Sequence, residues 1–178
     1  MRRSMALLAC CALTTGPLAA QEAIYGFEWQ GGGGYSMRGA FAIDEGLATG
    51  PRLDQEAVTC FEVTGFSGGQ AIGRWALGQL QEDTTWVLTF DLESRALVPF
   101  GTGDPMPQAW NMDGFGRNCG EGGFGFNIGN AAQDICLNNE LIVESQVPPP
   151  TPIPTRPLPA FEFSGDACRT VPLFSRGP

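Results

Sequence analysis

The sequence predicts an all-β protein, built as an antiparallel β-sandwich or jelly-roll-like fold of about eight short strands with a proline-rich C-terminal extension. Three observations carry this prediction. The 25 glycines and 14 prolines would interrupt long helices, apolar residues recur with a period of two rather than 3.6, and glycine or proline turns separate the alternating segments. The same alternation is compatible with a closed barrel, and the sequence leaves that alternative open.

The clearest strand is the segment TTWVLTFDLE at 84–93, in which Trp86, Leu88, Phe90 and Leu92 fall on one face and Val87 with four polar residues on the other. Seven further segments alternate in a similar way: 25–29, 35–43, 59–63, 75–77, 124–128, 141–143 and 161–163. Four consecutive glycines, Gly31 to Gly34, separate the first two of these, and they give the backbone the positive φ angles that a tight reversal needs. We therefore expect a hairpin over residues 26–44 with a structural role.

The N-terminal residues have the three parts of a secretory signal, namely two arginines, an apolar stretch and small residues ending at Ala20. Leu7 to Cys10 also resemble a lipobox, but the apolar run before Cys10 is short for one. We expect a signal peptide at 1–20, a β-sandwich domain at 21–146, a proline-rich extended segment at 147–159 and a C-terminal tail at 160–178 that packs back on the domain. The expected location is secreted or periplasmic.

Charge and cysteine content support this interpretation. After cleavage, eight arginines face 19 acidic residues, a formal charge of −11, which argues against binding nucleic acid or, once the signal is removed, a membrane. Four cysteines remain, and an even number in an exported chain predicts two disulfides. We expect Cys119 to pair with Cys136, closing the long loop, and Cys60 to pair with Cys168, holding the tail.

The string FEWQGGGGYSMRGAFAID, followed by GRWAL, TWVLTF and GFGFNIG, resembles a group of secreted bacterial proteins of unknown function that often carry a PEP-CTERM sorting tail. The resemblance spans roughly residues 24–137 and implies a β-rich exported domain. It implies no catalytic residues. The final segment, RTVPLFSRGP, has neither the PEP-like signal nor a hydrophobic anchor, so the resemblance does not extend to surface attachment.

The residue types narrow the chemistry further. The chain has no histidine and no lysine, which excludes Ser-His-Asp triads, Cys-His dyads, Schiff bases and histidine-ligated metals. A pair of carboxylates is the one common catalytic device left, and no pair among the 19 acids stands out, so we assign no catalytic residue. We expect an uncharacterised binding module for a glycan, a matrix component or an extracellular protein. The alternative is a small carboxylate-dependent glycan hydrolase or lyase.

The segment from Pro99 to Gly123 is too long and too rich in glycine for a turn, and we expect functional residues there. Its one tryptophan could stack on a sugar ring or a partner surface, and its acids offer charge; the expected ligand-binding residues are Trp110, Asp113 and Glu121. The same segment concentrates hard oxygen ligands that suit calcium, namely Asp104, Asn111, Asp113, Asn118 and Glu121. No other cofactor is expected. An ordinary polar loop, with the tryptophan plugging the end of the sandwich, is the structural alternative.

Overall fold

The computed structural model describes residues 22–112 and 118–169. Twelve strands form one antiparallel sheet, and they are β1 (Glu22–Gln30), β2 (Tyr35–Asp44), β3 (Arg52–Asp54), β4 (Val58–Ser67), β5 (Gln70–Ala76), β6 (Thr85–Asp91), β7 (Ala96–Leu97), β8 (Gln108–Met112), β9 (Phe124–Ile128), β10 (Gln133–Leu137), β11 (Glu140–Val147) and β12 (Ile153–Pro157). Helical structure in the described ranges is limited to three 3₁₀ turns: η1 (Glu45–Leu47), η2 (Gln55–Ala57) and η3 (Leu77–Gln79). The all-β prediction is confirmed.

The sheet has more strands than the sequence predicted. Seven of the eight predicted segments are strands, whereas 161–163 is irregular. The five additional strands are β3, β7, β8, β10 and β12. Most surprising is β12, which lies in the proline-rich segment and pairs with β1 on one side and β7 on the other. The sequence predicted an extended backbone for the proline-rich segment but did not predict that this segment would pair within the sheet.

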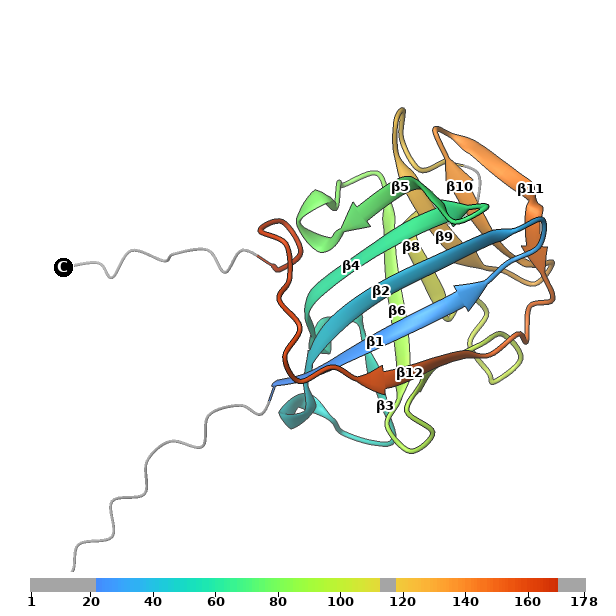
Figure 1. The fold of residues 1–178 in the computed structure, drawn as a ribbon. Coiled ribbons are helices and arrows are strands. Elements are labelled where there is room, and N and C mark those ends of the chain that lie inside the picture. Colours follow the sequence, from blue (N-terminus) through green and yellow to red (C-terminus); the bar gives the residue numbers. More distant parts are fainter. Residues whose placement is uncertain (1–21, 113–117, 170–178) are drawn as a thin grey trace, which may run out of the picture.

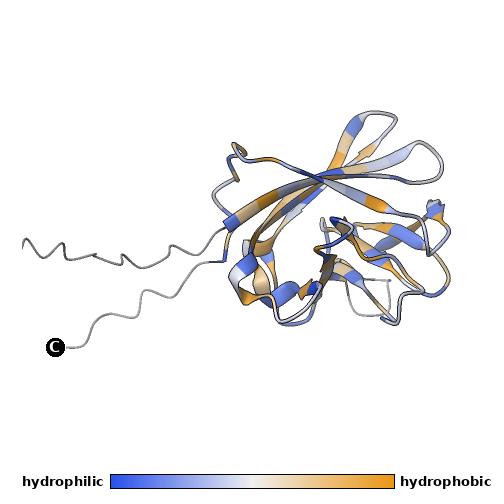
Figure 2. Cartoon of the chain, turned by 90° about the horizontal axis from the view of Figure 1, so that it is seen from below, coloured by the Kyte–Doolittle hydropathy of each residue, from blue (hydrophilic) through white to orange (hydrophobic). Residues whose placement is uncertain are grey.

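The strands follow the order β11-β10-β9-β8-β6-β7-β12-β1-β2-β4-β5, with β3 pairing to β6. The sheet curves so that β1, β2, β4 and β5 lie in front of β6, β8 and β9 in Figure 1. Aromatic rings meet between these two parts: the ring centroids of Phe27 and Trp110 are 5.2 Å apart, and those of Phe61 and Trp86 are 4.9 Å apart. Figure 2 shows apolar and hydrophilic residues interspersed along the strands, as a sheet with one face on the core requires.

The predicted hairpin is present, and its four glycines have a packing role. Gly33 and Gly34 have φ angles of 59° and 82°, which close the turn between β1 and β2. The amide of Gly32 donates a hydrogen bond to the carbonyl of Ser145 in β11 at 2.9 Å, and a Cβ on Gly32 would lie 2.6 Å from the carbonyl oxygen of Glu144. The glycines therefore let the backbone of β11, at one end of the sheet, lie directly against the tip of the β1–β2 hairpin.

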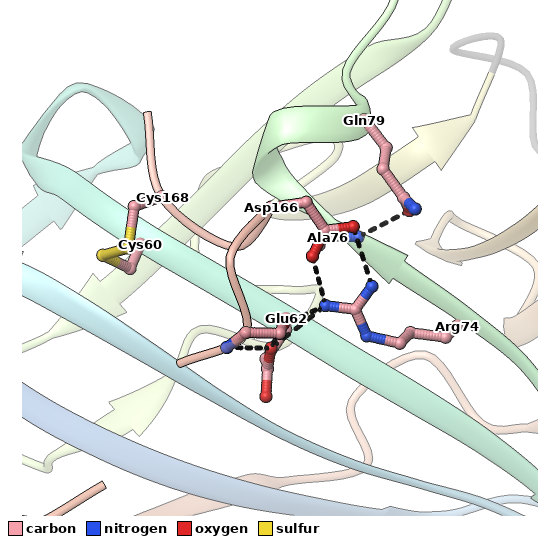
Figure 3. Close-up of polar contacts among 8 residues, drawn as sticks. Cys60, Glu62, Arg74, Ala76, Gln79, Asp166 and Cys168 are labelled. Carbon is pink, nitrogen blue, oxygen red and sulfur yellow. Dashed lines mark hydrogen bonds and ion pairs between the residues drawn. A yellow bond between two sulfur atoms is a disulfide. The ribbon is translucent and has the colours of Figure 1, made fainter. Parts of the chain in front are cut away.

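The C-terminal segment 161–169, which we call the strap, lies against β4 and the end of β5. The Cys60–Cys168 disulfide joins the strap to β4 (Figure 3). Beside it, Arg74 Nη2 lies 2.7 Å from Asp166 Oδ1 and 3.1 Å from Glu62 Oε2, so one guanidinium bridges strap and sheet. The Arg74 guanidinium also holds the pKa of Asp166 below its usual value. The last residues of the expected tail, 170–178, and the expected signal peptide lie outside the described residues.

Candidate functional site

The predicted functional loop, 99–123, contains a buried strand. Strand β8 occupies the middle of the segment, and all five of its residues are buried. Trp110 is 0% exposed, and its ring centroid lies 4.9 Å from those of Phe61 and Phe126. The prediction that Trp110 presents a stacking face to a ligand is therefore wrong. The residues before β8 and those after it line two separate pockets.

The pocket after β8 is a cleft of about 440 Å³ that we call the amide cleft. One wall is the segment between β5 and β6, and the other is the turn 118–124. Polar side chains dominate the lining: Arg74, Gln79, Gln81, Asp83, Thr84, Asn111, Asn118 and Glu121. Of the predicted ligand-binding residues, Glu121 lies here, whereas Asp113 lies outside the described residues.

Packing of β9 against β4 and β5 brings the two walls of the amide cleft together. Phe124 follows the turn 118–123, and a Cβ on Gly65 or Gly73 would lie 2.2 Å or 2.8 Å from atoms of its side chain. Only glycine admits Phe124 this closely, so Gly65 in β4 and Gly73 in β5 allow strands far apart in sequence to pack face to face. No local pattern in the sequence indicates this contact, and the wall formed by Gln79 to Thr84 was not predicted.

Five polar contacts and a disulfide hold the turn 118–124 in place. Asn111, whose φ is 53°, donates from its Nδ2 atom to the carbonyl oxygens of Cys119 and Phe124 at 3.0 and 2.9 Å. The amides of Gly120, Gly122 and Gly123 donate to Asn118 Oδ1, Asn138 Oδ1 and the carbonyl of Gly120, respectively. The Cys119–Cys136 disulfide joins the turn to β10, and both predicted disulfide pairings are present. The cleft wall is thus preorganised.

Of the expected calcium ligands, Asn111, Asn118 and Glu121 line the amide cleft, whereas Asp113 lies outside the described residues. Asp104 lines the other pocket, where its carboxylate pairs with Arg52 at 3.2 Å. The side chains of Asn111 and Asn118 bind backbone groups of the turn through Nδ2 and Oδ1, respectively. Across the described ranges, no group of three or more His, Cys, Asp or Glu side chains could hold a metal ion.

The described lining of the amide cleft is negatively charged. Arg74 is the one cationic side chain among the lining residues that the structure describes, and Asp166 and Glu62 already balance its charge. Asp83 and Glu121 therefore set the local charge, and both are exposed. Such a lining disfavours anionic ligands and suits a neutral ligand rich in hydroxyl groups, because carboxylates accept hydrogen bonds and carboxamides both donate and accept them.

Asp134 is a buried acid on the face of β10 that points away from the aromatic core. It is 5% exposed, its Oδ2 accepts a hydrogen bond from Gln146 at 3.3 Å, and its Oδ1 has no hydrogen-bond partner in the described part of the chain. Burial raises the pKa of Asp134 from 3.8 to about 6, although the amides of Gln146 and Asn127 act in the opposite direction.

Replacing Asp134 by asparagine should change how stability depends on pH. Between pH 4 and pH 6 the folded protein holds a proton on Asp134 that the unfolded chain has released, so stability falls as the pH rises through this window. The Asp134→Asn variant lacks this decline. Relative to the parent protein, the free energy of unfolding of the variant should rise by about 2 kcal/mol between pH 4 and pH 6.5, as measured by urea denaturation. A constant difference across that range would show that Asp134 titrates normally.

Comparison with known proteins gave no match: no protein-family model, curated protein or solved structure resembles this chain. The described ranges contain no helix with the length and apolarity that a membrane crossing requires. The functional proposal therefore rests on the site itself.

Proposed function

We propose that the chain is an exported, non-enzymatic β-sandwich module that binds a neutral glycan in the amide cleft. The observation that carries this proposal is the convergence of carboxamide and carboxylate side chains on a cleft of about 440 Å³, within the usual size range of small-ligand sites. Hydrogen bonding would dominate recognition, because Trp75, the tryptophan that borders the cleft, is only 2% exposed.

Export to the periplasm or the medium is part of the same proposal. Two disulfides in one short chain are typical of oxidising compartments. The signal-like N-terminal residues and the strongly acidic composition favour the same location. Membership of the secreted bacterial group that the sequence resembles is likewise proposed, and it rests on the glycine and aromatic spacing alone.

Glycan-array screening followed by calorimetry tests the proposal. Asp83→Ala and Glu121→Ala should each weaken binding of the selected neutral oligosaccharide by about tenfold, the effect expected from losing one or two hydrogen bonds to ligand hydroxyls. Both side chains are exposed, so the melting temperature should stay nearly constant.

Matched controls are available on the same surfaces. Glu82→Ala changes the exposed acid next to Asp83, and Glu140→Ala changes an exposed acid at the start of β11; neither residue lines the cleft, and both variants should bind normally. Failure to bind any neutral glycan, or equal affinity in all four variants, would contradict the proposal.

A carboxylate-dependent glycan hydrolase or lyase is the second candidate, because Asp83 and Glu121 line the same cleft and such enzymes use two carboxylates. Mass spectrometry of the bound oligosaccharide after long incubation distinguishes the two functions. Intact oligosaccharide supports the binding module, whereas shortened products that both Asp83→Asn and Glu121→Gln abolish would support the enzyme.

A further inference from the structure

The pocket before β8 is larger than the amide cleft and shares no described lining residue with it. Its volume is about 830 Å³. Phe100 and Met106 supply apolar surface, and Asp104, Asn127 and Asn130 supply polar groups. We call it the Phe100 pocket. Apolar surface combined with a few placed polar groups is the usual form of a small-molecule site.

Asn127 is the buried polar side chain in the lining of the Phe100 pocket, and it is 9% exposed. Its neighbours in β9, Phe126 and Ile128, belong to the aromatic core, so the carboxamide of Asn127 lies on the opposite face of the strand. A Cβ on Gly129, which also lines the pocket, would lie 3.4 Å from Asn127 Nδ2. The carboxamide therefore lies at the wall of the pocket.

One edge of this carboxamide has no partner in the described part of the chain. A carboxamide has two N–H donors and an acceptor oxygen. The Asn127 amide lowers the pKa of Asp134, its partner in β10, so one N–H faces that carboxylate. The partner of Asn127 in β8 is Ala109, which has no polar side-chain group, and no described residue donates a hydrogen bond to Asn127 Oδ1. The second N–H and Oδ1 thus form a free edge, with a donor beside an acceptor.

The apolar part of the lining suits a flat aromatic ring. Phe100 is half-buried and packs against the aromatic core, which holds its ring in place. Met106 is also half-buried, and contacts between a thioether and an aromatic ring are favourable. The described lining has no cationic side chain and contains the carboxylate of Asp104, so a negatively charged ligand is disfavoured.

We propose that the Phe100 pocket is a second binding site, for an uncharged planar heteroaromatic molecule that carries a carboxamide or an equivalent edge with a donor beside an acceptor. The ring would contact Phe100 and Met106, and the edge would form two hydrogen bonds with Asn127. Asparagine forms the same pair of hydrogen bonds when it reads the edge of an adenine base. Free nucleobases and pyridine carboxamides belong to this class, whereas their phosphorylated derivatives do not.

Three probes that share a pyridine ring test this site: nicotinamide, acetylpyridine, in which a methyl ketone replaces the amide, and nicotinate, in which a carboxylate replaces it. NMR titration of the full chain measures each affinity and reports where each probe binds. Nicotinamide should bind in the millimolar range, with shifts at Phe100, Met106 and Asn127. Acetylpyridine lacks the donor for Asn127 Oδ1 and should bind about tenfold more weakly. Nicotinate should bind more weakly than nicotinamide by at least the same factor, because of its charge.

Two variants locate the preference for the amide. In Asn127→Ala, nicotinamide and acetylpyridine should bind with equal affinity, because the edge that distinguishes them is gone. Gln70→Ala removes an exposed carboxamide that does not line the Phe100 pocket, so this variant should keep the preference of the parent protein.

Equal affinity for nicotinamide and acetylpyridine in the parent protein would overturn the proposal whatever the variants do. A preference that persists in Asn127→Ala, nicotinate binding as tight as that of nicotinamide, or no binding of nicotinamide at millimolar concentrations would overturn it too. Shifts confined to residues 118–124 would place the probes in the amide cleft and count against a second site. The glycan proposal stands or falls separately, because it depends on Asp83 and Glu121.

Discussion

Replacing Trp110 by alanine is expected to lower the free energy of unfolding by about 3–5 kcal/mol. Trp110 is the centre of the aromatic core: its ring centroid lies 5.2 Å from that of Phe27 and 4.9 Å from those of Phe61 and Phe126. These partners come from β1, β4 and β9, on both sides of the core. Truncation would leave a cavity between paired strands, which cannot move inward to fill it. The free energy of unfolding should therefore fall by the full contribution of the lost burial and packing.

Urea denaturation at one pH measures this effect, and Leu80→Ala is a suitable control. Leu80 is a large apolar residue that is 41% exposed, so its truncation should lower the free energy of unfolding by much less than the Trp110→Ala substitution does. A Trp110→Ala variant as stable as the control would mean that the side chain lies at the surface, as the ligand-stacking hypothesis requires.

The burial of Trp110 was difficult to predict because the sequence of β8 does not resemble that of a buried strand. Strand β8 reads QAWNM, and its two amide side chains suggested a solvated loop. Both amides are buried instead, and their nitrogens are paired: Gln108 Nε2 donates to the carbonyls of Thr89 and Val98, and Asn111 Nδ2 donates to those of Cys119 and Phe124. Backbone carbonyls thus accept from the side-chain nitrogens of these buried polar residues, and only the tertiary structure supplies those acceptors.

The proline-rich strand β12 was not predicted for a related reason. Proline cannot donate a ladder hydrogen bond, so a proline-rich run argues against a strand in the middle of a sheet. Here only short stretches pair: Ile153 and Pro154 with β7, and residues 155–157 with β1. Ile153, fully buried, anchors the strand. Composition could predict its extended backbone but not its place in the sheet.

Prediction succeeded where local pattern or covalent chemistry decided the outcome. The β1–β2 hairpin follows from alternation and the glycine turn, and the disulfides follow from four cysteines in a chain with a signal-like N-terminus. In the candidate site, Asn118 and Glu121 lie in one cleft because they share a turn. Their partners across the cleft, such as Asp83, come from a distant segment that only the packing of β9 on β5 brings near. No local sequence pattern predicts that contact.

Removing the Cys60–Cys168 disulfide should have the second large effect. The double variant Cys60→Ala/Cys168→Ala opens a loop with a sequence separation of 108, and the chain-entropy estimate for such a loop is about 4.7 kcal/mol. The matched variant Cys119→Ala/Cys136→Ala opens a separation of only 17 and should lose about 3 kcal/mol. Denaturation of both variants under identical conditions compares the two disulfides directly.

Hydrogen exchange at individual amides distinguishes two roles of the disulfide. It either holds the strap against β4 in the folded protein or stabilises the protein only through the unfolded chain. The amide of Phe61 donates to the carbonyl of Ala167, and the amide of Arg169 donates to that of Thr59, so both amides report on the strap. In the Cys60→Ala/Cys168→Ala variant, hydrogen exchange at Phe61 and Arg169 should accelerate more than exchange within the β1–β2 hairpin. Should those two amides keep their protection, the ion pairs of Arg74 with Asp166 and Glu62 would suffice to hold the strap, and the disulfide would act only on the unfolded chain.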